Sequence, residues 1–333
     1  MAVTIKDIAK AANVSPSTVS RVIKDHYSIS DETKARIRAI MDEMGYQSAS
    51  IVENIKTIGV VFPRNGEDVY ENPFYLETIR GIGIICNQRN YMMNIITGGD
   101  DRELRKSIRN TKADGYIFLY ADANDQMIQY MQEQKLLFVL IGKATSNVNE
   151  TICVDTDNVQ AGYDATMHLI SNGHQRIGYI GTDDRHLFSL DRKMGYQRAL
   201  HDHQLQIPHD DIINLRTHST HNHHRLIQRL KADDHPSAYV VCDDIYALIL
   251  KNLIIEAGRK IPDDISIVSF NNSIFSRITT PPLTSFDINA RQLGIEAANQ
   301  LIKHVENKDL YATRIIVPYY LMHRASVKNK NQD

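Results

Sequence analysis

The sequence predicts an α/β protein in which a small helical head precedes a large domain of two lobes with parallel sheets. Residues 1–46 carry three amphipathic helical patterns separated by cap residues. From residue 58, short apolar runs alternate with helical patterns in two successive series, which is typical of parallel sheets covered by helices. We therefore divide the chain into a head at 1–46, a linker at 47–57 and a large domain at 58–333.

Composition indicates a globular protein of more than one domain. The chain has 333 residues, of which 42% are hydrophobic and 23% charged, and its net charge is −2. No run of about 18 apolar residues is present, so we expect no membrane span. The N-terminus begins on an amphipathic pattern instead of a signal peptide, and the three cysteines have neither disulfide nor metal spacing. These features predict a cytoplasmic protein with no cofactor.

The first helix is expected to begin after Thr4, a good cap residue, with Asp7 in its first turn. The second follows a tight turn, with Ser15 as cap and Pro16 at the first helical position. Ser30 caps the third, and Gly45 ends it. The apolar positions fall at helical spacing: Ile5, Ile8, Ala9 and Ala12, then Val19, Val22 and Ile23, then Ile37, Ile40, Met41 and Met44.

Two helices joined by a tight turn, with a third behind them, form a helix-turn-helix. The second helix carries Ser17, Ser20 and Arg21 on its polar face, which suits base edges and phosphates in a major groove. Lysines and arginines barely outnumber acidic residues in this segment, so the prediction rests on the motif and not on bulk charge. The alternative is a plain three-helix bundle whose polar face is only solvated.

The amino-acid sequence of this head resembles that of the LacI/GalR family of bacterial repressors. The matching stretches are residues 3–9 (VTIKDIA), 14–22 (VSPSTVSRV) and 33–46. The resemblance implies that the second helix lies in the major groove, with base contacts from Pro16, Ser17 and Arg21. It also implies phosphate contacts from Thr4, Ser15, Thr18, Ser20, Ser30 and Thr33.

The linker departs from that family. Members usually have a Pro-Asn pair and then an Ala-Arg-Ser-Leu stretch, which folds on DNA into a hinge helix whose leucine enters the minor groove. Here the segment is QSASIVENIKT, which lacks the proline, arginine and leucine and carries Glu53. Two interpretations remain open: Ile51, Val52 or Ile55 is the wedge, or the segment is a tether without DNA contact.

In the large domain, strands are predicted at 58–62, 91–96, 116–119 and 137–141, and then at 177–180, 212–215, 239–241 and 267–270. Helices are predicted at 74–89, 101–111, 157–172, 192–203, 221–230 and 245–257. We expect one lobe from 58–157 with 290–318 and another from 158–289 with 319–328. Ligands of such sheets bind at the carboxyl ends of the strands, so the cleft between the lobes is the expected site.

No catalytic motif is found: a phosphate-binding glycine loop and a nucleophile elbow are both missing. The histidines at 218, 221, 223 and 224 suggest a metal site, but no cysteine or acidic ligand accompanies them, so a solvated helix start is the preferred interpretation. The acidic pairs at 183–184 and 243–244 could be paired acids or could bind hydroxyl groups.

The large domain resembles the periplasmic-binding-protein fold that the same family uses as its sensor. Stretches 71–74, 114–121, 141–143, 157–166 and 287–289 resemble the maltose-operon branch found in low-GC Gram-positive bacteria. The family correspondence places effector contacts at Phe74, Tyr75, Arg192, Asp243 and Asn271. At the position of Asn271, family members commonly have aspartate. Arginine and carboxylate groups suit sugar hydroxyls, and aromatic faces suit a pyranose. The alternatives are a surface role for Arg192 and a core role for Phe74.

Together these observations predict a homodimeric repressor that binds double-stranded, near-palindromic operator DNA and responds to a sugar. Maltose or a maltodextrin is the expected effector, with no metal, and we expect the sugar to weaken DNA binding. Three other possibilities are a regulator of another sugar operon, a sugar-binding protein without DNA binding, and an α/β enzyme. The head disfavours the second, and the missing phosphate-binding loop disfavours the third.

Overall fold

The computed structural model describes residues 3–23, 26, 28–46, 56–63, 71–123, 125–207, 209–215 and 220–332. The chain divides into two compact units, residues 1–56 with 90–92 and the remaining residues. No helix in the described part of the chain is both long and apolar enough to cross a membrane.

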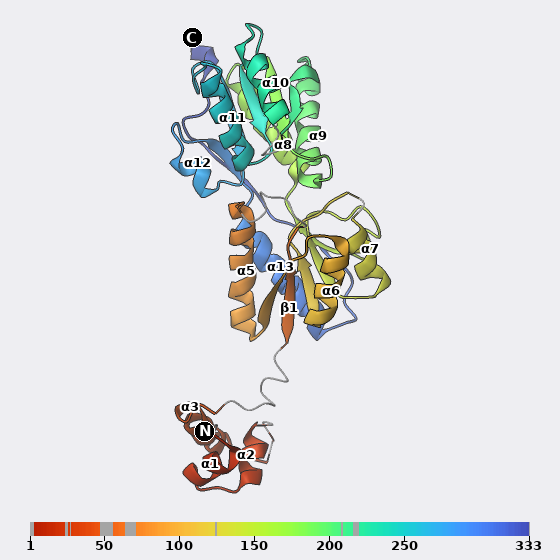
Figure 1. The fold of residues 1–333 in the computed structure, drawn as a ribbon, viewed down its shortest axis with the longest axis vertical. Coiled ribbons are helices and arrows are strands. Elements are labelled where there is room, and N and C mark those ends of the chain that lie inside the picture. Colours follow the sequence, from red (N-terminus) through yellow and green to blue (C-terminus); the bar gives the residue numbers. More distant parts are fainter. Residues whose placement is uncertain are drawn as a thin grey trace. The chain divides into compact units, whose positions relative to one another are not determined.

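The head consists of helices α1 (Ile5–Ala11), α2 (Pro16–Ile23) and α3 (Asp31–Glu43), and their predicted starts are confirmed. Thr4 forms a capping box with Asp7, and Ser30 caps α3 by accepting the backbone N–H of Thr33. The predicted apolar stripes meet in one core, in which Ile8, Val19, Val22 and Ile37 are completely buried. This core leaves the polar face of α2 exposed, while the ribbon in Figure 1 shows the three helices packed together.

The first lobe of the large domain is built on a sheet with strand order β11-β5-β4-β3-β1-β2. Its strands are β1 (Thr57–Val61), β2 (Met92–Ile96), β3 (Gly115–Phe118), β4 (Phe138–Ile141), β5 (Ile152–Asp155) and β11 (Arg314–Ile316). The pairings among β1, β3, β4, β5 and β11 are parallel. Its helices are α5 (Pro73–Arg89), α6 (Asp101–Thr111), α7 (Gln126–Glu133) and α13 (Ala290–Glu306) (Figure 1).

The second lobe has a sheet of order β12-β10-β9-β8-β6-β7. Its strands are β6 (Ile177–Gly181), β7 (Ile212–Asn214), β8 (Ala238–Val241), β9 (Ser266–Phe270), β10 (Thr284–Asp287) and β12 (Tyr320–Met322). Only β12 runs antiparallel among the pairings described. The α-helices are α8 (Asn158–Ser171), α9 (Leu187–Asp202), α10 (Thr220–Lys231), α11 (Asp244–Glu256) and α12 (Ile274–Ile278). Two short 3₁₀ helices are η1 (His209–Asp211) and η2 (Lys330–Gln332).

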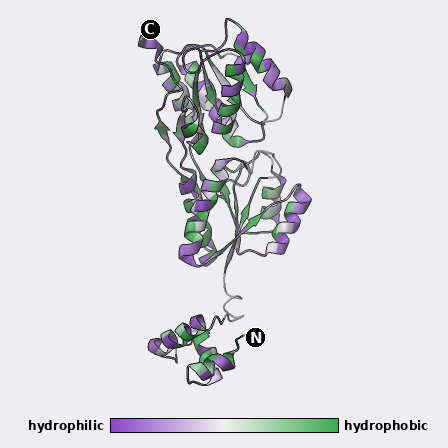
Figure 2. Ribbon diagram, turned by 60° about the vertical axis from the view of Figure 1, so that its left-hand side comes forward, coloured by the Kyte–Doolittle hydropathy of each residue, from purple (hydrophilic) through white to green (hydrophobic). Residues whose placement is uncertain are grey.

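Hydrophobic residues concentrate on the strands, and hydrophilic residues are frequent along the outer helices (Figure 2). The α/β fold class with a helical head is therefore confirmed. One strand differs from its prediction: the segment at 91–96 was expected to be buried, but Met92 and Ile95 are 51% and 56% exposed. The reason is that β2 is the edge strand of its sheet, so only its last residue, Ile96, faces the core.

Each lobe contains one helix pair that glycines bring into backbone contact. In the first lobe, a Cβ on Gly294 of α13 would lie 2.0 Å from the carbonyl oxygen of Thr78 on α5. In the second, a Cβ on Gly195 of α9 would lie 1.9 Å from the carbonyl oxygen of Val159 on α8. These distances leave no room for a side chain, so the close crossing sets the position of α9 and of the site residues that it carries.

Candidate functional site

A cavity of about 720 Å³ lies between the two lobes, where the carboxyl ends of their strands meet. This volume includes space that is open to solvent. Residues from both lobes line it, including all five predicted from the sequence: Phe74, Tyr75, Arg192, Asp243 and Asn271. We call it the main cavity.

Arg192 is the most completely enclosed of these residues, with 2% of its surface exposed. Its Nε donates to Asn158 Oδ1 at 2.9 Å, and its Nη1 donates to the carbonyl oxygen of Cys242 at 2.5 Å. The guanidinium also lies over the ring of Phe270, 4.2 Å from its centroid. The alternative of a surface arginine is therefore wrong, and so is the predicted helix start at 192, because α9 begins five residues earlier and carries Arg192 inward.

Asp243 joins the two lobes at the cavity wall. Its Oδ2 accepts hydrogen bonds from Asn72 of the first lobe at 3.0 Å and from Asn271 of the second at 2.6 Å. Its Oδ1 accepts the N–H of Ile245 and so caps α11. Burial raises the pKa of this carboxyl to about 6.

Asn271 has a physical reason to differ from the aspartate expected of the family. Its amide Nδ2 is the donor in the 2.6 Å bond to Asp243. An aspartate there would place a second carboxylate against the first, and one of the two would have to hold a proton. The amide therefore lets Asp243 keep its charge.

Phe74 and Tyr75 form the aromatic part of the first-lobe wall. Both belong to the first turn of α5, and their ring centroids are 5.3 Å apart in an edge arrangement. Each is only partly buried and lines the cavity, so Phe74 is not a fully buried core residue. Phe188, at the start of α9, adds a third aromatic side chain from the second lobe.

Several lining residues were not predicted from the sequence. Lys143 follows β4 and forms an ion pair with Asp191 of α9, and Asp122 follows β3 and accepts from His186 Nδ1 at 2.9 Å. Both contacts join the two lobes. Asp155, at the end of β5, lies beside them, and burial raises its pKa to about 7. Their position at strand ends was the available signal, since β3 and β4 themselves were predicted.

In the head, the exposed surface of α2 includes Pro16, Ser17 and Arg21, the three residues predicted to contact bases. The hydroxyls predicted to contact phosphates lie at the helix starts and already bond locally. Thr4 Oγ1 donates to Asp7, Ser15 Oγ bonds Ser17 and Thr18, and Ser30 Oγ donates to Thr33. Ser20 is half-buried on α2. The linker residues Ile51, Val52, Glu53 and Ile55 lie outside the described residues.

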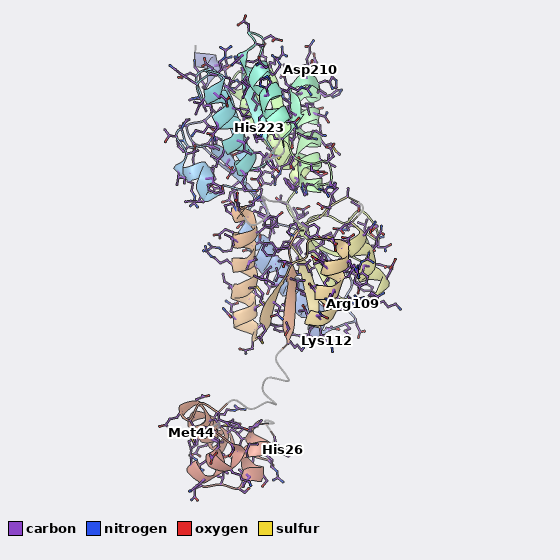
Figure 3. All side chains as sticks on the ribbon, viewed as in Figure 1. His26, Met44, Arg109, Lys112, Asp210 and His223 are labelled. Atoms are coloured by element: carbon purple, nitrogen blue, oxygen red, sulfur yellow. The ribbon has the colours of Figure 1, made fainter. Side chains whose placement is uncertain are left out.

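The histidine cluster falls on α10 of the second lobe, where Figure 3 labels His223. His218 lies outside the described residues. Among the residues that the structure describes, no group of three His, Cys, Asp or Glu side chains is placed to hold a metal ion. The two members of the acidic pair at 243–244 have different surroundings. Asp243 lines the main cavity, while Asp244 accepts hydrogen bonds from the hydroxyls of Ser269 and Ser285 in the interior.

Known proteins resemble the chain over both units. Residues 4–48 match the family of bacterial regulatory proteins, lacI family, and residues 166–327 match the periplasmic binding protein-like domain. The HTH-type transcriptional regulator MalR of Streptococcus pneumoniae is 33% identical over 97% of this chain and 100% of its own length. The chain belongs to the LacI family.

Solved structures of LacI-family proteins support the assignment. A transcriptional regulator LacI from Bacillus cereus subsp. cytotoxis is 34% identical, with a TM-score of 0.78 over 83% of this chain and 99% of the other. A probable maltose operon transcriptional repressor from Staphylococcus aureus is 26% identical, with a TM-score of 0.74 over 82% and 98%. The chain is thus a LacI-family DNA-binding transcriptional repressor and not an enzyme.

Proposed function

We propose that this LacI-family repressor responds to a neutral glucose-based sugar, maltose or a maltodextrin, bound in the main cavity. The observation that carries the proposal is the charge balance of that cavity. Its lining contains four acidic side chains, on Asp122, Asp155, Asp191 and Asp243, against the cations of Lys143 and Arg192.

Both cations are already engaged. Lys143 pairs with Asp191, and Arg192 donates to Asn158 and to a backbone carbonyl. A phosphate or carboxylate ligand would meet an excess of negative charge, whereas sugar hydroxyls both donate to carboxylates and accept from amides. Phe74, Tyr75 and Phe188 supply apolar faces for pyranose rings. The resemblance to a probable maltose operon transcriptional repressor supports the choice of glucose units.

The test is an operator-binding titration of the full-length protein with a panel of ligands. We expect maltose or maltotriose to weaken operator binding about 5- to 100-fold, the usual range of allosteric coupling, and glucose 6-phosphate to have no effect. Arg192→Lys should blunt the response to sugar without changing operator affinity in its absence, because lysine cannot reproduce the guanidinium fork. Arg198→Lys on the exposed side of the same helix is the matched control. A response to the phosphate ester alone would refute the neutral-sugar proposal.

For the head, we propose base contacts by Pro16, Ser17 and Arg21 and phosphate contacts by Thr4, Ser15, Thr18, Ser20, Ser30 and Thr33. Arg21→Ala should reduce discrimination between the operator and a scrambled duplex about 10- to 100-fold, because arginine reads guanine with two hydrogen bonds. Arg36→Ala, an exposed arginine on α3, is the control and should leave the ratio unchanged. Equal ratios for wild type and Arg21→Ala would remove the assigned role.

We also propose that the repressor acts as a homodimer. The support is a set of exposed apolar side chains on α5, β2, α11 and α12. Two of these elements, α5 and α12, lie along one side of the large domain in Figure 1. They are Leu76, Ile84, Met92, Ile95, Ile255, Ile274 and Ile278, which are between 37% and 67% exposed. Burial of these exposed apolar side chains against a second copy would be favourable, and twofold symmetry would match a palindromic operator.

A further inference from the structure

A second cavity, with about 420 Å³ of empty space that is partly open to solvent, lies next to the main cavity in the first lobe. The two share three lining residues: Ala121, Asp122 and Lys143. The shared residues follow β3 and β4, so the second cavity extends the binding region outward past the carboxyl edge of the first sheet, toward α7. We call it the side cavity.

The side cavity has an apolar floor and polar walls. Ile128 of α7 and Leu140 of β4 form part of the floor. The walls carry the amide of Gln129 and the hydroxyls of Thr145 and Ser146, all three on residues exposed to solvent. Amides and hydroxyls both donate and accept hydrogen bonds, which is the complement of a polyhydroxylated ring.

Charge argues against an anionic occupant. The side cavity contains the carboxylates of Asp122 and Asp125 and the amine of Lys143. Asp122 accepts from His186, Asp125 caps α7 through the N–H of Met127, and Lys143 pairs with Asp191. The charged groups are therefore committed to holding the loops and the lobes, and the uncharged groups remain for a ligand.

We propose that the side cavity is a further sugar subsite, so that the effector is a linear glucose oligosaccharide of at least three rings and not the disaccharide alone. This inference rests on the proposed function of the main cavity and specifies its ligand. Because Ala121, Asp122 and Lys143 line both cavities, a ring added beyond these residues would lie in the side cavity. Gln129, Thr145 and Ser146 then select for chain length by binding the additional ring.

The test is calorimetric titration of the full-length repressor with maltose, maltotriose and maltotetraose. One or two net hydrogen bonds to an added ring predict an affinity gain of about 5- to 30-fold from maltose to the longer chains. If maltose binds and the longer chains bind no more tightly, the side cavity is only a solvated recess and the inference is wrong. If none of the three binds, the proposed function of the main cavity fails, and this inference fails with it.

A double variant separates the subsite from the main cavity. Gln129→Leu with Thr145→Val removes two polar groups from the side cavity at exposed positions, where folding should not suffer. We expect maltotriose to lose its advantage over maltose, while the affinity for maltose stays close to that of wild type. Gln126→Leu, an exposed glutamine of α7 outside the cavity lining, is the matched control and should retain the full advantage. An equal loss for all sugars in the double variant would overturn the assignment.

Discussion

Buried carboxyl groups in the main cavity make the stability of the folded protein depend on pH. Asp155 is the clearest example, because burial outweighs its hydrogen bond from the N–H of Thr156 and raises its pKa to about 7. The folded protein therefore binds a proton at this site over a range in which the unfolded chain, with an ordinary pKa of 3.8, has released it. Stability contributed by this group falls as pH rises from about 4 to about 7 and is constant above that.

Asp155→Asn should remove this penalty, since the amide keeps the shape and an acceptor oxygen without the charge. We expect the variant to gain stability relative to wild type at pH 8, on the order of 1–3 kcal/mol, and little at pH 4. Urea unfolding at the two pH values measures the difference. His168 and His174, whose pKa values burial lowers to about 4, act in the opposite direction but are the same in both proteins. A pH-independent difference would contradict the account.

At the scale of elements, the sequence predicted the helices of the head, but it missed three helices and four strands of the large domain: α7, α12, α13, β5, β10, β11 and β12. The helices of the head could be predicted because cap residues and apolar spacing are local signals, as with Thr4 and Ser30. Strands β11 and β12 have three residues each, with exposed side chains at both ends, so no alternation identified them. They exist because β5 and β10 offer an open edge, which is information from the folded sheet and not from the segment itself.

The lining of the main cavity could be predicted only in part from the sequence. The five residues carried over from the family all line it. Lys143 and Asp191 were not found, because they are 48 positions apart and are brought together only where one lobe faces the other. The contact of Asp122 with His186, 64 positions apart, has the same origin. Contacts between lobes produce no regular spacing in the sequence, so they can be identified only from the structure.

The glycine crossing of α8 and α9 makes a prediction at this scale. Gly195→Ala places a Cβ against the backbone of Val159, so the helices must separate, and overpacking of this kind costs about 1–3 kcal/mol. Because α9 also carries Asp191 and Arg192, sugar affinity should fall together with stability. Urea unfolding and sugar titration check the two effects.

The control for that experiment is Gly83→Ala on α5. A Cβ there would meet only the methyl of Met93, at 4.0 Å, so the added methyl has room. Replacing a helical glycine in open space should stabilise the protein by about 0.5–1 kcal/mol and leave sugar affinity unchanged. If both variants destabilised equally, close helix packing would not be the cause.

At the scale of the whole molecule, the proposed dimer can be tested by placing charge on its apolar surface. Ile278, at the end of α12, is 67% exposed. Ile278→Glu should weaken self-association and lower the affinity for a palindromic operator at least about 10-fold, because two linked heads bind more tightly than one. Sedimentation velocity and operator titration measure the two effects.

Met194→Glu is the matched control, because Met194 is 54% exposed on α9, away from α5 and α12 in Figure 1. This variant should remain dimeric with wild-type operator affinity. Dissociation caused by Met194→Glu but not by Ile278→Glu would move the interface to the other side of the large domain.

The return of the chain to the first lobe has a consequence for biosynthesis. Helix α13 packs on β3, β4 and β5, and β11 pairs with β5, yet both emerge from the ribosome more than 130 residues after β5. Until then, the face of the first sheet that α13 covers lacks this helix, and apolar side chains of the nascent lobe are exposed. A protein truncated before α13, near residue 289, should accordingly aggregate and should not fold into a smaller ligand-binding domain.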